Sequence, residues 1–145
     1  MSEEKIKVYV EIENLRLRLV APEGMLGDCV DKLETVMNHP GKLYLDIRDV
    51  SALFKDCSTI RFAKMEIENA RWNDSCVKAV EGLLKGGKIL ILVEHGDDFS
   101  LKCYEEIMEG LAEASEKCNG NESVFLVTDC FSQGKKCTLY FWTGE

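Results

Sequence analysis

Long apolar runs and basic side chains are both scarce in this sequence. No stretch approaches the ~20 apolar residues of a membrane-spanning helix, and the first residues, Met1-Ser2-Glu3-Glu4, have neither the basic start nor the apolar core of a signal peptide. We therefore expect a cytoplasmic protein. Only 18 Lys and Arg stand against 26 Asp and Glu, giving a net charge of −8. Such a surface repels phosphate backbones and anionic lipid, so neither nucleic acid nor a membrane is an expected partner.

Arrangements of residues that could support metal or nucleophilic chemistry are also lacking. The two histidines, His39 and His95, both fall in turn-like contexts, so no Ser/His/Asp or Cys/His arrangement is indicated. Asp97 and Asp98 follow His95 on one turn, where three neighbours rarely converge on one ion, and no metal site is expected. The seven cysteines are scattered without a CxxC or CxxH pair, which is typical of free thiols in a reducing compartment.

Nucleotide-binding motifs are also missing. The sequence has no GxxxxGK[ST] and no GxGxxG after a predicted strand. The segment Gly24-Met25-Leu26-Gly27 is too short and too poor in donors to cradle a triphosphate. We therefore expect no cofactor, no affinity for GTP or ATP, and no hydrolysis by these residues alone.

The length of 145 residues predicts a single domain, 1–145, with a β extension at 1–24. Alternating apolar residues from 8 to 19 indicate one bent strand or a hairpin. A core-facing helix follows, and after Pro40-Gly41 a short helix in which Asp49 can be the N-cap. The apolar positions of these two helices are Leu26, Cys29, Val30, Leu33, Val36 and Met37, then Val50, Leu53 and Phe54.

Residues 59–143 predict an α/β arrangement. Strands at 59–67 and 88–93 flank a helix capped by Asn73 or Asp74, and Ser100 caps a long helix ending near Asn119. The continuous apolar run from 88 to 93 is typical of a central strand that is buried on both faces. Closing strands at 123–129 and 136–143 are expected to form a hairpin. The prediction is a two-layer α+β domain with a four-stranded mixed sheet, its first three strands parallel and the last antiparallel.

The long helix carries two distinct faces. Its predicted core stripe is Leu101, Tyr104, Ile107, Met108 and Leu111. The opposite face is acidic and is expected to be solvated.

One segment resembles a known family. The stretch Asn38-His39-Pro40-Gly41-Lys42-Leu43-Tyr44-Leu45-Asp46-Ile47-Arg48-Asp49-Val50 is similar to the segment of FtsZ proteins in which a central helix ends at Pro-Gly and runs into an N-x-D-x-x-D-V loop. The helix at 71–80, the strand at 88–93, the turn at 96–101 and the closing Thr143-Gly144 follow in that family's order. The resemblance covers about four-fifths of the chain. It implies that residues 25–145 form an FtsZ/tubulin C-terminal-like domain.

The resemblance also implies a contact surface. In the FtsZ family this loop enters the GTP site of the next subunit, where two aspartates polarise the attacking water. Asp46 and Asp49 hold the matching positions, and Tyr44 stands where the family has Asn. Tyr44, Asp46, Arg48 and Asp49 are thus the expected interface, with Asp46 and Asp49 as acids acting on a partner's site. The simpler alternative is that Asp49 caps the short helix and Asp46 is a solvated carboxylate.

These features favour a non-catalytic FtsZ-like C-terminal domain that mediates protein–protein assembly. Its partner would be itself or an FtsZ/tubulin-type filament protein, which it would regulate or cap in cell division. A second hypothesis is a small oligomeric ligand-binding protein or enzyme with a pocket between subunits. A third is a purely structural protein with an unknown partner.

Overall fold

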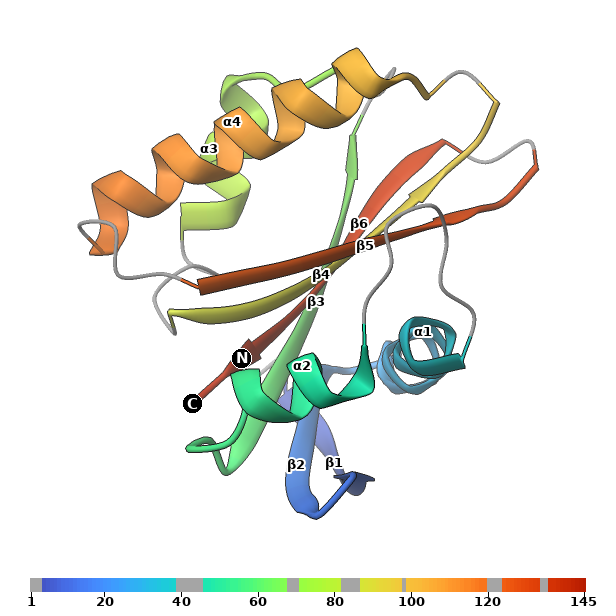
Figure 1. Ribbon diagram of the computed structural model, residues 1–145, viewed down its shortest axis with the longest axis vertical. Coiled ribbons are helices and arrows are strands. Elements are labelled where there is room, and N and C mark those ends of the chain that lie inside the picture. Colours follow the sequence, from blue (N-terminus) through green and yellow to red (C-terminus); the bar gives the residue numbers. More distant parts are fainter. Residues whose placement is uncertain are drawn as a thin grey trace.

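The computed structural model describes residues 4–38, 46–67, 71–81, 87–97, 99–119, 124–133 and 136–145. They form a six-stranded mixed sheet with two helices on each face (Figure 1). The strands are β1 (Glu4–Ile12), β2 (Leu15–Pro22), β3 (Thr59–Ile67), β4 (Lys88–His95), β5 (Val124–Phe131) and β6 (Cys137–Gly144). The helices are α1 (Leu26–Asn38), α2 (Ile47–Leu53), α3 (Asp74–Glu81) and α4 (Leu101–Asn119).

The N-terminal segment is a hairpin, which decides between the two expected forms. β1 and β2 pair antiparallel up to Ile12 opposite Leu15. β2 then pairs parallel with β3, with Leu19 opposite Ile60. The hairpin therefore extends the sheet to six strands, and the prediction of four was wrong, because the outer side of β3 is still able to pair and β2 occupies it.

The strand order is β1-β2-β3-β6-β4-β5. β3, β4 and β5 run in one direction and β6 against them, as predicted, but β5 and β6 do not form a hairpin. Instead β6 lies between β3 and β4. Every residue of β6 is buried, whereas β5 ends in exposed Val124 and Phe131, so the strand that is apolar on both faces takes the centre.

Helices cover both faces of the sheet, so the expected two-layer arrangement was also wrong. α1 and α2 pack on one face, against side chains that include Leu90, Leu92 and Trp142. α3 and α4 pack on the other, against Ile91 and Phe141 of the same two strands. α2 contacts both β1 and β5, the two edge strands, so the sheet curls around the α1/α2 face (Figure 1).

The prediction that residues 88–93 form an interior strand buried on both faces is confirmed, because Ile89 to Val93 in β4 are fully buried. Helix faces were predicted less well. Val30 of α1 is 40% exposed and Leu101 of α4 is 73% exposed, although both belonged to predicted core stripes. Leu101 is the first residue of its helix.

Candidate functional site

The first turn of α2 carries the residues that the FtsZ resemblance selects. Asp46 is the N-cap: its Oδ1 accepts a hydrogen bond of 2.8 Å from the backbone N of Arg48. The Arg48 guanidinium returns to the same carboxylate, with Nη2 3.0 Å from Oδ2. These hydrogen bonds hold the pKa of the Asp46 carboxyl below its ordinary value. Asp46 is therefore ionised and fixed in position.

Asp49 lies in the same turn but does not cap the helix. The alternative expectation, in which Asp49 is the cap and Asp46 a solvated carboxylate, was therefore wrong about which acid is the cap. The cap is Asp46, because the helix begins at Ile47, three residues earlier than a cap at Asp49 requires. Asp49 is exposed, and a spacing of three residues places it on the same side of the turn as Asp46. Tyr44 lies outside the described residues.

The outer surface of this turn is mixed in character. The Arg48 side chain is 79% exposed and Ile47 is 39% exposed. Val50 and Leu53 anchor the turn from beneath, because both are buried in the core on the α1/α2 face. The turn therefore shows one apolar side chain, Ile47, between the charged side chains of Asp46 and Arg48.

A second feature is a charged cavity of about 480 Å³ between α1 and the sheet. Its walls come from α1, β3, β4 and β6. The lining residues are Asp28, Lys32, Lys64, Glu66, Glu94, Lys136, Thr138 and Tyr140.

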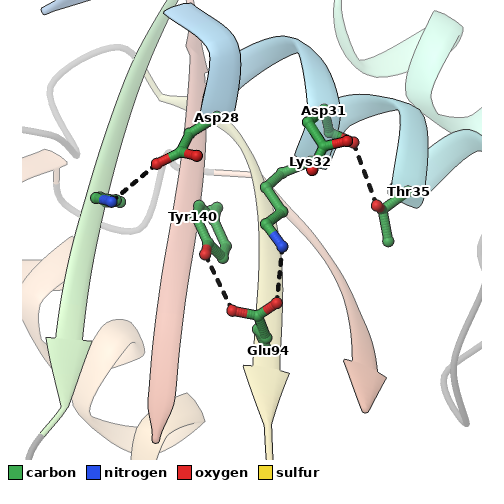
Figure 2. Close-up of polar contacts among 7 residues, drawn as sticks. Asp28, Asp31, Lys32, Thr35, Glu94 and Tyr140 are labelled. Carbon is green, nitrogen blue, oxygen red and sulfur yellow. Dashed lines mark hydrogen bonds and ion pairs between the residues drawn. The ribbon is translucent and has the colours of Figure 1, made fainter. Parts of the chain in front are cut away.

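Glu94 is the buried centre of this cavity. Lys32 Nζ lies 2.7 Å from Glu94 Oε2, and the Tyr140 hydroxyl donates to Oε1 at 3.0 Å (Figure 2). Burial alone would lower the pKa of Lys32, but the hydrogen bond and charge of Glu94 outweigh it and raise the pKa. Burial, followed by the charge of Glu94, raises the pKa of Tyr140. The three groups therefore form one network that ties α1 to the sheet.

Comparison with known proteins supports only the fold. No protein-family model matches the chain, and no curated protein matches it. Among solved structures, a tryptophan-to-tyrosine mutant of FtsZ from M. jannaschii aligns with a TM-score of 0.61 and 19% identity, over 83% of this chain. The chain has an FtsZ-like fold.

Two further structures extend the comparison. An empty FtsZ dimer from M. jannaschii aligns with a TM-score of 0.56 and 20% identity over 81% of the chain. TubZ of Bacillus thuringiensis serovar israelensis, in a GTPγS-form protofilament, gives a TM-score of 0.49 and 8% identity over 81%. The aligned region spans 38%, 36% and 34% of those three chains respectively. This coverage is consistent with the C-terminal domain of FtsZ only.

Sequence reasoning missed the polar groups buried in this FtsZ-like domain. The Lys32–Glu94 pair joins residues 62 positions apart, and the only signal was a Glu at the end of an apolar strand. A turn was expected at His95, but His95 is the buried last residue of β4. Its Nε2 lies 2.8 Å from Asp129 Oδ2, and its ring stacks on Phe99.

Other expectations concern metals, membranes and thiols. Within the described ranges, no group of three or more potential His, Cys, Asp or Glu ligands could hold a metal ion. Nor does any helix in those ranges have the length and apolar character to cross a membrane. The six cysteines whose side chains are described are free thiols.

Neutralising Glu94 is expected to destabilise the domain. Glu94→Gln keeps the shape but leaves Lys32 without its counter-ion, which should cost about 1.5–3 kcal/mol of unfolding free energy. The control is Asp28→Asn at the Lys64–Asp28 pair in the same cavity, where the side chains are 34% and 46% exposed. That change should cost about 0–1 kcal/mol. Urea unfolding measures both, and equal losses would show that the Glu94 network contributes nothing special.

The raised pKa values of three thiols predict that the domain loses stability at alkaline pH. Burial raises the pKa of Cys29 and Cys130 from 9.0 to about 11, and that of Cys137 to about 12. A raised native pKa means that the unfolded chain releases its proton first, so the stabilisation is complete below pH 9 and is lost as pH rises to 11–12. Cys137→Ala removes one of these protons and should flatten the slope by up to about 1.4 kcal/mol per pH unit between pH 9 and 12. Unfolding curves at successive pH values test it, and an unchanged slope in the variant would contradict it.

Proposed function

We propose that this chain is a non-catalytic FtsZ-like assembly domain, which binds an FtsZ/tubulin-type filament protein through the first turn of α2. The observation that carries the proposal is the exposed turn at Asp46–Asp49, in which Arg48 hydrogen-bonds the Asp46 carboxylate, on a domain with the FtsZ-like fold. The alternative partner is a second copy of the chain. In either case the role is protein–protein assembly, with filament regulation in cell division as its setting.

The geometry of α2 supports docking by this turn. The Asp46 carboxylate accepts hydrogen bonds from the backbone N and the guanidinium of Arg48, so this side chain loses little conformational entropy on binding. Asp49 and Ile47 remain exposed to meet a partner. By the resemblance to FtsZ, this segment would enter the nucleotide face of the neighbouring subunit and place its two carboxylates there.

Capping follows from an asymmetry in these 145 residues. A head-to-tail filament grows only when each subunit offers both halves of the contact. The turn at α2 supplies one half, and the sequence carries no tubulin-type phosphate loop for the other. The 145-residue chain should therefore bind the exposed nucleotide face of a terminal subunit and block the next addition.

The experiment is a titration of an FtsZ-type protein with this chain, followed by light scattering and GTP hydrolysis. We expect shorter polymers at substoichiometric amounts of the chain. A matched control is the chain with Arg71→Ala, which removes an exposed Arg outside α2 and should act like the unaltered protein. Unchanged polymer mass, length and turnover at equimolar addition would overturn the capping proposal.

The charged cavity favours a second candidate function, the binding of a small polar ligand. Of its lining residues, Glu94 and Tyr140 are buried, whereas Glu66 and Lys136 are exposed. This cavity lies within one chain, whereas the sequence hypothesis placed a pocket between subunits. A shift in thermal midpoint with small zwitterionic compounds, absent in a Glu66→Ala/Lys136→Ala variant, would support it.

A further inference from the structure

The two edges of the sheet differ in their protection against pairing. In β1, four of the nine residues are Glu or Lys, and its register with β2 shifts between Glu4 and Ile6. Charges and bulges of this kind prevent edge-to-edge association. β5 has the sequence VFLVTDCF and an unbroken register with β4. Its one charged residue, Asp129, turns inward to His95, so the outer side of β5 has no such protection.

The outward peptide groups of β5 follow from its hydrogen bonds to β4. Val124 N donates to Gly87 O, and beyond the end of the strand Ser132 N donates to His95 O. Even-numbered residues therefore face β4. Because peptide groups alternate along a strand, those of Phe125, Val127 and Phe131 point away from the sheet. Within the described part of the chain, no strand lies beyond β5.

Apolar side chains flank this open edge on both faces of the sheet. Val124 is 50% exposed and Phe131 is 57% exposed. Phe125, Leu126 and Val127 pack against the two cores but are only partly buried, so neither helix layer covers them completely. Apolar groups beside unpaired backbone are what an added strand would cover.

We propose that β5 pairs antiparallel with β5 of a second copy, about a two-fold axis perpendicular to the sheet. The two six-stranded sheets then become one continuous sheet. A two-fold axis of this kind sets odd-numbered residues opposite odd-numbered ones, which matches the outward peptide groups. With Thr128 opposite itself, Phe125 lies opposite Phe131 of the second copy, a favourable aromatic cross-strand pair.

A second copy fits this edge better than an unrelated peptide. Each chain carries a net charge of −8, which opposes self-association in general. The β5 edge is the exception, because it sets no like charges opposite each other when it meets its own copy. Its apolar residues lie at both ends of the strand, so antiparallel pairing brings the two exposed ends together.

The test is sedimentation velocity from micromolar to submillimolar concentration. The unaltered chain should form a dimer, and Val124→Lys with Phe131→Lys should raise its dissociation constant about tenfold or more, as a loss of one strong contact does. Both residues are exposed, so the monomer should keep its fold. The control variant, Tyr9→Lys with Leu101→Lys, changes two equally exposed residues outside β5 and should leave the dimer intact.

Amide hydrogen exchange provides the second measurement. The amides of Phe125 and Val127 should become protected as concentration rises, while those of the neighbouring even-numbered residues are protected throughout. A chain that stays monomeric at every concentration would overturn the proposal. So would a dimer that resists the β5 variant, or one that the control variant abolishes.

Discussion

Leu92→Ala is expected to lower the free energy of unfolding by about 2–5 kcal/mol, the range for a large core side chain truncated to alanine. Leu92 is fully buried on the α1/α2 face of β4, with β6 on one side and β5 on the other. The cavity left behind cannot collapse easily, because both neighbouring strands are held to β4 by hydrogen-bonded ladders. Urea unfolding measures the loss.

Leu126→Ala is the matched control for this prediction. Leu126 faces the same core but lies on the edge strand β5, where it is only partly buried. Its truncation should cost about half as much, since less apolar surface returns to water. A greater loss for Leu126 than for Leu92 would contradict the strand order, because it would make β5 an interior strand and β4 an edge strand.

The second large effect concerns GTP turnover by a capped filament. If Asp46 and Asp49 place their carboxylates in the partner's nucleotide site, the chain should support hydrolysis in the terminal subunit. Replacing both with Asn should abolish this added turnover, since an amide cannot act as the charged acceptor of a proton from water. Asn is a good N-cap, so Asp46→Asn keeps the helix start intact.

The control for that experiment is Asp74→Asn. Asp74 is an exposed acid in the first turn of α3, so the change removes a carboxylate charge from the first turn of another helix. It should leave turnover unaltered. Turnover that persists with both Asp46 and Asp49 replaced would assign these acids to docking or capping alone.

The sequence predicted local structure well and strand neighbours poorly. Periodicity and capping residues gave the helices, because Asn73 and Ser100 act within three residues of themselves. The insertion of β6 between β3 and β4 depends on pairings such as Met65 with Leu139, which no short-range pattern encodes. A hairpin was predicted for β5 and β6 because a short turn joins them, but burial of β6 on both faces outweighs that local preference.

Of the candidate site too, only the locally encoded part was predicted from sequence. The residues of the α2 turn were found from sequence because they are adjacent in the chain and match a family segment. Their arrangement was not, since whether Asp46 or Asp49 is the cap depends on a shift of three residues in the helix start. The Lys32–Glu94–Tyr140 network was missed because its members come from three separate elements.

We expect the first turn of α2 to bind an FtsZ-type partner. The most direct measurement is an amide NMR titration of the labelled chain with GTP-loaded FtsZ that is blocked from polymerising. We predict that signals of residues 46–50 shift or broaden most, and that Asp49→Ala weakens the binding while Asp74→Ala does not. No binding, or perturbation confined to residues outside α2 and its flanks, would contradict the account.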